Sequence, residues 1–559
     1  MRNRPKRRIS CAGSCFAQHI GAQFKKRGFN YVDLETPPPA LSRERWHEFV
    51  YDLYSARYGN IYTPRQLIQM LARANGSLQP VETAYVDENG RARDPFRPAI
   101  EPDGFADIDE LEADRRYLLS QVASMLDQTD LFVFTLGLTE AWESIEDGVA
   151  LPTCPGTVGG TFDTDKYRFK NFDYEETLQD MNAFIALARE KNPQMKFLLT
   201  VSPVPLTATA TDQHVLPATL YSKSVLRAVA GALSQKHDFV DYFPSYELIA
   251  SHPMRAMYYI PNLRKLQPRA SRRPWMCSFP PLAISRAVTS KNPVRRHPSR
   301  PTMTTFSVKK PFCRLSANEP LYLRKLSYCC NQAGYESGLE KKTDVHVFAL
   351  GSGAYETNPF SEIRDSRIFF TEPLYSERLE TATSEVSIDD THVWGLVTGT
   401  HNNRILRGEF WKEATPACLD HPDLRPVSRA VVDAIIDDDQ RYIKAFLAQL
   451  KQIKAKFFVI SCPPVRRNSV IAGSGIPLDI ISAIDSRARQ CFTNWLSEQG
   501  IPFIAPPEGT MDDQGFLLKE YSLEKTFTGK RDPHHANADY GTLMYKQIQD
   551  FLAQNHPEI

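Results

Sequence analysis

The same succession of sequence segments occurs twice in the chain, and this repetition constrains the fold more than any other feature. In the first half, a stretch with helical periodicity at residues 174–190 leads into the apolar run KFLLTVSPVPL at 196–206. In the second half, a helical stretch at 427–451 leads into KFFVISCPPVRR at 456–467. Short apolar runs of this kind are typical of strands buried in a parallel sheet. Each half therefore predicts helices that alternate with buried strands.

Further strand-like segments flank these pairs in the same order in both halves. A chain of 559 residues is too long for one hydrophobic core. Because strands alternate with helices throughout, we predict two three-layer α/β/α domains of flavodoxin-like type, each with a parallel sheet. The flanking segments are ISCAGSCFA (9–17), LFVFTLGLTEAW (131–142) and FVDYFPSYE (239–247) in the first half, and VHVFALGSGAY (345–355), HVWGLVTGTHNN (392–403) and IPFIAPPEG (501–509) in the second.

The middle of the chain breaks this pattern. Residues 248–318 contain no Asp or Glu, and they are rich in Arg, Lys and Pro. Repeated prolines disfavour helix and central strand, and like charges repel. We predict domains at 1–263 and 343–559, joined by an irregular basic linker at 264–342. A second interpretation is that this stretch is translated out of its ancestral reading frame, across codons 264–325.

Charge, hydropathy and cysteine spacing exclude several classes of function. The formal net charge is +1, so nothing global favours nucleic acid as a partner. No stretch approaches 18 consecutive apolar residues, so we expect no membrane insertion and a cytoplasmic location. The ten cysteines form no CxxC pair, and we predict free thiols, no metal site and no cofactor.

Gly13-Ser14-Cys15-Phe16-Ala17 resembles the signature for which the GSCFA family, grouped with the SGNH hydrolases, is named. The likeness covers about residues 8–263. The second half resembles the SGNH group more loosely, through a Gly-Ser pair after a strand and DPHHAN at 532–537. The resemblance implies a serine esterase or acyltransferase that acts on a carbohydrate or small ester. Beyond GSCFA, the likeness of the first half rests on RYGNIYTPRQL (57–67), TLGLTEAW (135–142), TVSPVPLTAT (200–209), YSKSVLR (221–227) and DYFPSYELI (241–249).

The second half has the fuller set of catalytic residues. Ser352 follows an apolar strand and a glycine, in the position that we expect for a nucleophile after the first strand of the sheet. Asp532 and His535 are three residues apart, so the carboxylate can orient the imidazole that accepts the serine proton. The alternative is a structural capping loop, since Asn537 is a plausible cap for a closing helix. The resemblance suggests Gly399 and Asn402 as donors to the oxyanion.

The first half offers Ser14 as the nucleophile that the resemblance implies, with Gly59, Asn60 and Gly137 as oxyanion donors. It has no Asp and His pair at the corresponding place near its end. His214 is the nearest alternative base and His19 is another, although either is more often structural. Thr139 stands where an SGNH turn would have asparagine, and Glu140 is the polar residue beside it.

Three functions remain open from the sequence. The first is acyl transfer or hydrolysis through an acyl-serine, with a small molecule or glycan as substrate. The second is a non-catalytic protein that keeps the fold and binds a glycan or a partner. The third is a basic linker that docks nucleic acid, whose binding would weaken steeply with salt. The acyl group, the acceptor and the oligomeric state are not encoded in any motif.

Overall fold

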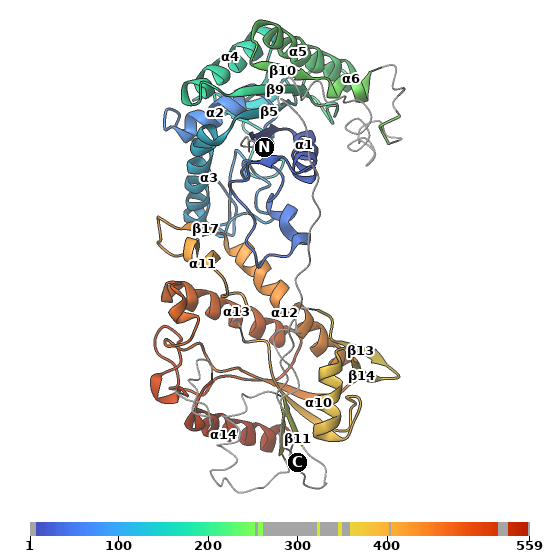
Figure 1. Cartoon of the computed structure of the whole chain (residues 1–559), viewed down its shortest axis with the longest axis vertical. Helices are drawn as coiled ribbons and strands as arrows, with labels where there is room; N and C mark the ends of the chain where they lie inside the picture. Colours follow the sequence, from blue (N-terminus) through green and yellow to red (C-terminus); the bar gives the residue numbers. More distant parts are fainter. Residues whose placement is uncertain are drawn as a thin grey trace, which may run out of the picture. The chain divides into compact units, whose positions relative to one another are not determined.

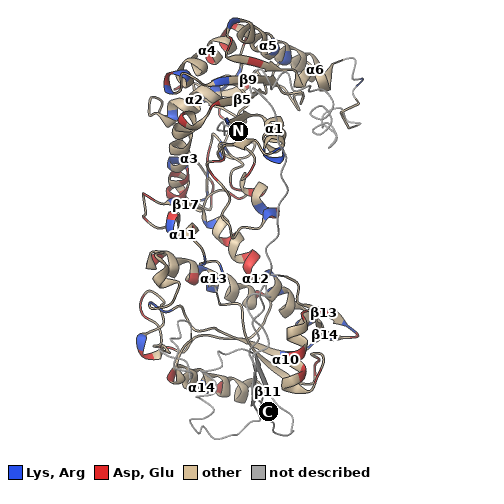
Figure 2. Cartoon of the chain, in the orientation of Figure 1, with Lys and Arg blue, Asp and Glu red and all other residues tan. Residues whose placement is uncertain are grey.

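In the computed structural model, the chain forms two compact units (Figure 1). One unit contains residues 1–38 and 43–299, and the other contains residues 39–42 and 300–559. Lys and Arg are interspersed with Asp and Glu in both units, in line with the balanced formal charge (Figure 2). The structure describes residues 7–251, 255, 257–260, 321–324, 345–348, 358–401, 404–523 and 535–556.

A five-stranded parallel sheet forms the centre of the first unit, in the order β10-β9-β5-β1-β2. β1, the first strand in the chain, lies inside the sheet between β2 and β5. The order of the strands therefore reverses direction between β1 and β5. In open parallel sheets, ligands bind beyond the carboxyl ends of the strands at such a switch point. The strands are β1 (Arg8–Gly13), β2 (Asn30–Tyr31), β5 (Leu131–Leu136), β9 (Lys196–Val201) and β10 (Val240–Phe243).

Helices connect these strands and bury their apolar faces on the sheet. α4 contacts α2, α3 and α5, and α1 contacts β1, β2 and β5. All residues of β5 are buried, as a strand covered on both faces requires. The helices are α1 (Cys15–Lys26), α2 (Pro64–Ala74), α3 (Ile108–Gln128), α4 (Tyr174–Lys191), α5 (Val215–Lys236) and α6 (Ser245–Ala250), with a 3-10 helix η1 (Arg43–Phe49).

The first unit also contains two small antiparallel sheets. β3 (Tyr85–Val86) pairs with β4 (Ala92–Arg93). β6 (Glu140–Ser144) pairs with both β7 (Ala150–Leu151) and β8 (Tyr167–Asn171).

A buried ionic cluster holds the long connection between β2 and α3. Arg57 Nη1 lies 3.0 Å from Asp114 Oδ1, and its Nη2 lies 3.1 Å from Glu101 Oε1. Arg97 lies 2.6 Å from Asp114 and 2.8 Å from Asp94. Because these arginines are paired with carboxylates, their charges are compensated although they are buried. The cluster fixes the loop that precedes Gly59 and Asn60.

The second unit repeats the same topology, with a five-stranded parallel sheet in the order β12-β11-β15-β18-β19. Its chain-first strand, β11, again lies inside the sheet. The strands are β11 (Leu321–Arg324), β12 (Val345–Phe348), β15 (Val393–Val397), β18 (Lys456–Ile460) and β19 (Phe503–Ile504).

This topology corrects two expectations from the sequence. β11 falls within the predicted linker at 264–342 but pairs with β12 and β15, so the second domain begins before residue 343. The segment at 345–355 was expected to supply the first strand, yet β12 is the second strand and lies at the edge of the sheet. Periodicity identifies a strand but not its neighbours, because pairing depends on distant residues. Residues 264–320, including most of the linker, lie outside the described residues.

Helices cover both faces of the second sheet. Alternate residues of β15 and β18 belong to two different apolar clusters. Trp394, Leu396 and Val459 pack with α12 and α13, whereas Val397 and Ile460 pack with α14. The elements that complete the unit are α10 (Pro373–Thr383), α11 (Phe410–Glu413), α12 (Arg429–Gln452), α13 (Leu478–Glu498), α14 (Ala538–Asn555), β13 (Ser361–Arg364), β14 (Arg367–Phe370), β16 (Ala414–Pro416), β17 (Arg425–Val427), η4 (Ala472–Ser474) and η5 (Lys519–Tyr521).

The prediction of an α/β fold with parallel sheets is confirmed. The helices expected at 174–190 and 427–451 correspond to α4 and α12. The expected closing helix is α14, whose N-cap Asn537 accepts a hydrogen bond from the Tyr540 backbone N–H. Within the described ranges, no helix combines the length and the apolar character that crossing a membrane requires.

Candidate active site

Ser14 occupies the junction between β1 and α1, at the carboxyl edge of the first sheet. It is the N-cap of α1, and an N-cap serine normally accepts a hydrogen bond from the first turn of its helix. Here the side chain makes no capping bond. Its Oγ is buried and has no hydrogen-bond partner within the described part of the chain. The hydroxyl is thus held at a helix N-terminus without a structural task.

Gly13 permits this junction because no other residue fits there. Its φ is +143°, a value that side chains disfavour, and a Cβ atom would lie 2.5 Å from the Thr135 carbonyl oxygen. Gly13 also accepts a hydrogen bond of 3.0 Å from the Ile61 backbone N–H. The backbone that carries Ser14 is therefore pressed against β5 and tied to the 59–62 loop.

The turn after β5 also lies against the β1–α1 junction. Gly137 and Leu138 both donate backbone hydrogen bonds of 3.0 Å to the Tyr62 carbonyl oxygen. A Cβ atom on Gly137 would lie only 3.0 Å from Ser14 Cβ. Three segments, the β1–α1 junction, the 59–62 loop and the turn after β5, therefore meet at Ser14. This is the switch point of the sheet.

The three expected oxyanion donors, Gly59, Asn60 and Gly137, belong to two of these segments and differ in their contacts. Asn60 Oδ1 accepts a hydrogen bond of 2.5 Å from the Tyr54 hydroxyl, which in turn accepts one from Gln18 Nε2 at 2.9 Å. That bond orients the Asn60 amide and directs its NH2 group away from Tyr54. Gly59 has a φ of +71° and shapes the turn. The Gly137 N–H is engaged by Tyr62, so it does not offer a free donor.

Lys223 on α5 contacts the turn after β5 at Gly137. It is 1% exposed, and its Nζ donates a hydrogen bond of 2.6 Å to the Gly137 carbonyl oxygen. Burial lowers the pKa of this amine to about 7, and among the described residues Cys15 opposes the shift. No role for Lys223 was predicted from the sequence. Its signal was the YSKSVLR segment, which places a lysine among the buried residues of a helix.

Other polar groups line the turn after β5. The Thr139 backbone N–H donates to Ser222 Oγ at 3.0 Å. The Oγ1 atoms of Thr135 and Thr139 are buried, and among the described residues they have no hydrogen-bond partner. Glu140 accepts a hydrogen bond from Thr209, and burial raises the pKa of its carboxyl group.

The two histidines considered as bases for Ser14 have other placements. His214 is the exposed N-cap of α5, and its Nδ1 accepts the Leu216 backbone N–H at 3.2 Å. His19 is exposed on α1, with its ring against Phe16. His19 lies five positions after Ser14, which at 3.6 residues per turn directs the two side chains to different faces of α1. Neither ring is shown in contact with the Ser14 hydroxyl.

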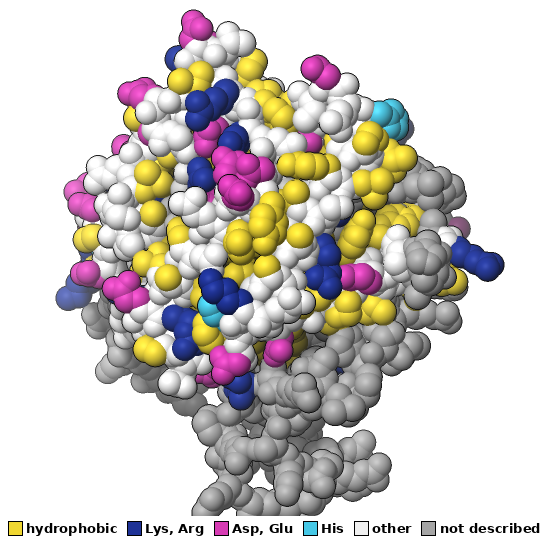
Figure 3. All heavy atoms as spheres, turned by 90° about the horizontal axis from the view of Figure 1, so that it is seen from above, with side chains coloured by type: hydrophobic (Ala, Val, Ile, Leu, Met, Phe, Trp, Pro, Cys, Tyr) yellow, Lys and Arg dark blue, Asp and Glu magenta, His cyan; other side chains and the backbone are white. Residues whose placement is uncertain are grey.

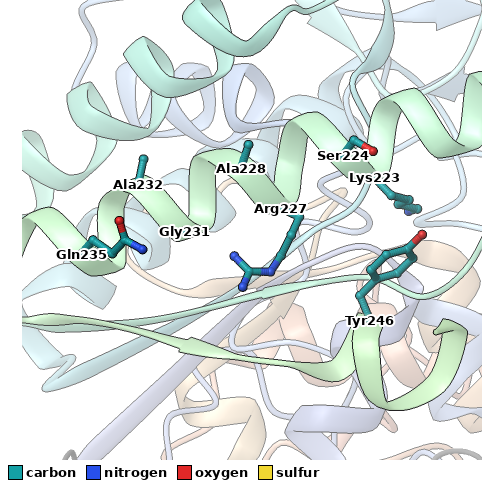
Figure 4. A pocket seen from close by; sticks show the side chains of 8 residues that line it. All are labelled: Lys223, Ser224, Arg227, Ala228, Gly231, Ala232, Gln235 and Tyr246. Carbon is teal, nitrogen blue, oxygen red and sulfur yellow. The ribbon is translucent and has the colours of Figure 1, made fainter. Parts of the chain in front are cut away.

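A groove with a volume of about 580 Å³ runs along α5 and ends at Lys223. Figure 4 shows Lys223 on α5 and the ring of Tyr246 on α6 at the same end of this groove. The small residues Ala228, Gly231 and Ala232 form its wall further along the helix. Hydrophobic side chains lie among charged ones on the face of the molecule seen from above (Figure 3).

Only part of the candidate site in the second unit is described. Ser352, Asp532 and Asn402 lie outside the described residues. His535 lies in the loop before α14, and its carbonyl oxygen accepts hydrogen bonds from Arg466 Nη1 at 2.8 Å and the Leu523 N–H at 3.0 Å. Ser352 follows the edge strand β12, so the expectation that it follows the first strand is wrong.

Gly399 follows β15 with a φ of +79°. A Cβ atom on it would lie 1.9 Å from the Phe492 ring. Packing therefore explains this glycine without reference to an oxyanion.

Within the described residues, no group of three or more His, Cys, Asp or Glu side chains is placed to hold a metal ion. The six cysteines in this part of the chain form no disulfide bond: Cys11, Cys15, Cys154, Cys418, Cys462 and Cys491.

Comparison with known proteins finds a family match in the first unit. The model of the GSCFA family matches residues 8–277, which is 14 residues beyond the predicted boundary at 263. A GDSL-like lipase from Bacteroides thetaiotaomicron is similar over 42% of this chain and 88% of its own, with 10% identity and a TM-score of 0.24. An extracellular lipase from Streptomyces rimosus is similar over 42% and 99%, with 11% identity and a TM-score of 0.23. No curated protein matches the sequence.

Proposed function

Since residues 8–277 belong to the GSCFA family, we propose that the first unit is a serine esterase or acyltransferase of the SGNH type, with Ser14 as its nucleophile. The observation that carries this proposal is the buried Ser14 hydroxyl. It has no hydrogen-bond partner among the described residues and stands at the switch point of a parallel sheet. A serine that served only to cap α1 would direct its Oγ to the helix backbone.

The surroundings of Ser14 suit the charge that develops when a serine attacks an ester. The first N–H groups of a helix have no intrahelical acceptor, and they favour a negative charge. Ser14 directly precedes α1, so the N–H groups of its first turn lie beside an oxyanion formed on Ser14. The Asn60 amide, oriented by Tyr54, supplies a side-chain donor from the adjacent loop.

The reaction divides into two steps. Ser14 Oγ bonds to the acyl carbon while the alcohol leaves, and an acceptor oxygen then takes the acyl group from Ser14. Water as acceptor gives hydrolysis, and a sugar hydroxyl gives transfer. We propose a carbohydrate or a small ester as the substrate.

The second unit is proposed as a further site of the same chemistry, built on Ser352, His535 and Asp532 with Gly399 and Asn402. The placement of His535 just before the closing helix α14 supports it. Against it, β12, which precedes Ser352 in the sequence, is an edge strand, and β11 separates it from the switch point between β11 and β15. We therefore rank Ser14 ahead of Ser352.

Labelling with a fluorophosphonate probe tests both sites in the full-length chain. We expect the wild-type protein to be labelled on Ser14, and the label to be lost in Ser14→Ala but kept in Ser352→Ala. Ser10→Ala is the matched control, because Ser10 lies on the same strand and its Oγ is hydrogen-bonded to Thr129.

Two results would overturn the proposal. A label that survives Ser14→Ala but disappears in Ser352→Ala would move the active site to the second unit. A folded wild-type protein without any label would favour the non-catalytic alternative, a glycan- or partner-binding protein.

A further inference from the structure

Burying the Lys223 amine costs free energy, and the contacts of this side chain do not offset that cost. Lysines are almost never fully buried unless a carboxylate pairs with them. Besides burial, Cys15 is the only described group that influences the charge of this amine, so no carboxylate compensates it. Within the described residues, its hydrogen bond is to the Gly137 carbonyl oxygen. A methionine or leucine would fill such a place at lower cost in free energy.

The position of Lys223 on α5 directs its side chain to the turn after β5. Leu216, Leu220 and Lys223 follow one another at helical spacing, and therefore share one face of α5. Leu216 is 61% exposed and Leu220 is 53% exposed, whereas Lys223 is 1% exposed. The stripe thus runs from solvent at the start of α5 to the buried turn after β5.

Lys223 and Ser14 are joined through two neighbours. Gly137 accepts the hydrogen bond from Lys223 Nζ, and its Cα faces Ser14 closely enough that a Cβ would come within 3.0 Å of Ser14 Cβ. Cys15, the residue after Ser14, interacts electrostatically with the Lys223 amine. Both neighbours link the amine to the backbone beside the unpartnered Ser14 hydroxyl.

We propose that Lys223 is the proton acceptor that activates Ser14, an inference that rests on acyl transfer at Ser14. A neutral amine has two N–H donors and one lone pair. One N–H keeps the bond to the Gly137 carbonyl oxygen, and the lone pair is left to accept the Ser14 proton. The Lys223 side chain thereby supplies the base that neither His214 nor His19 supplies.

Protons balance over the cycle. The Ser14 O–H proton moves to Lys223 Nζ as Oγ bonds to the acyl carbon, and the resulting ammonium gives it to the leaving alkoxide. The acceptor, water or an alcohol, then gives its proton to Lys223 as its oxygen attacks the acyl-serine. Nζ returns that proton to Ser14 Oγ when the acyl–serine bond breaks.

The charged and titratable groups around Lys223 allow this role. Cys15 comes from α1, Arg227 from the next turn of α5 and Tyr246 from α6, and all three are near the amine or its groove. Burial raises the pKa of the Cys15 thiol, which keeps it protonated and uncharged at neutral pH. Arg227 is paired with Glu247 at 2.5 Å. Burial, which lowers the pKa of Lys223 to about 7, therefore leaves a large neutral fraction at physiological pH.

The test measures the rate of fluorophosphonate labelling on Ser14 in the full-length protein as a function of pH. In the wild type we expect the rate to rise with pH, with a midpoint near 7. Lys223→Met should lower it by about 10²- to 10⁴-fold, the usual contribution of a general base. Lys223→Arg keeps the positive charge but cannot accept a proton, and should be equally slow. Lys236→Met, an exposed lysine on the same helix, is the matched control.

Chemical rescue separates catalysis from a structural role. In Lys223→Ala, added ethylamine should restore part of the labelling rate, and the restored rate should increase with the neutral fraction of the amine. If Ser14 is labelled in the wild type, but Lys223→Met and Lys223→Arg keep its rate and pH profile, the role of Lys223 is refuted while the proposed function stands. If wild-type Ser14 is not labelled, both are refuted.

Discussion

At the scale of single residues, two glycines and one lysine determine the surroundings of Ser14. Gly13 and Gly137 are required because the chain segments approach more closely than a side chain permits. Both stand out in the sequence, in GSCFA and TLGLTEAW. Lys223 was not singled out, because its burial depends on how α5 packs, and a lysine in a helix is usually exposed.

The protonation of Lys223 predicts how stability depends on pH. The pKa of the amine is about 7 in the folded protein and 10.5 in the reference state. Between these values the unfolded chain binds one more proton, so the free energy of unfolding should rise with pH, by about 1.4 kcal/mol per unit. Below about pH 7 both states are protonated and the slope vanishes.

Urea unfolding of the first unit between pH 6 and 10 measures this effect. The wild type should gain stability over that range relative to Lys223→Met, which has no amine to titrate. Lys236→Met should follow the wild type. Parallel curves for the wild type and Lys223→Met would show that the amine does not titrate in this window.

At the scale of elements, the irregular connection between β2 and α3 does as much for the site as the regular strands. It carries Gly59 and Asn60, and its Ile61 and Tyr62 bond to the two glycine turns. From the sequence we predicted regular strands and helices, but no structure for this connection. The reason is that Arg57, Glu101 and Asp114 are far apart in the chain, and pair only after the loop folds.

Asp114→Asn tests the role of this ionic cluster. It removes the charge that two buried arginines, Arg57 and Arg97, share. We expect the first unit to lose about 3–5 kcal/mol of unfolding free energy, as when one partner of a buried ion pair is removed. Asp109→Asn, in the exposed first turn of the same helix, should change it by less than about 0.5 kcal/mol. Equal effects of the two substitutions, measured by urea unfolding, would contradict the assignment.

At the scale of the whole molecule, the two units share one strand order, with the chain-first strand inside the sheet. The repetition in the sequence predicted two such sheets but paired the wrong segments in the second. VHVF at 345–348 has the composition of a first strand, yet the less apolar LYLR at 321–324 occupies that position. The order of strands follows from their pairing with distant segments, which local composition does not encode.

The basic middle segment gives a prediction about the gene. If the reading frame was lost there, one of the other two frames across codons 264–325 should encode an amphipathic helix, followed by a strand. The family match to residue 277 favours a change of frame beyond that point. Translation of the gene in all frames, compared with the same operation on codons 196–260 as control, decides the question. The absence of any such pattern would leave a genuine basic linker.

The sequence by itself determined the class of fold and the location of Ser14 at the end of a strand, because these depend on local periodicity and on glycine. The tertiary structure decided which strands are neighbours, that the Ser14 hydroxyl is buried without a described hydrogen-bond partner, and that Lys223 bonds to the nearby Gly137 carbonyl oxygen. These facts depend on side chains that lie up to 209 positions apart, between residues 14 and 223, and meet only when the sheet is assembled.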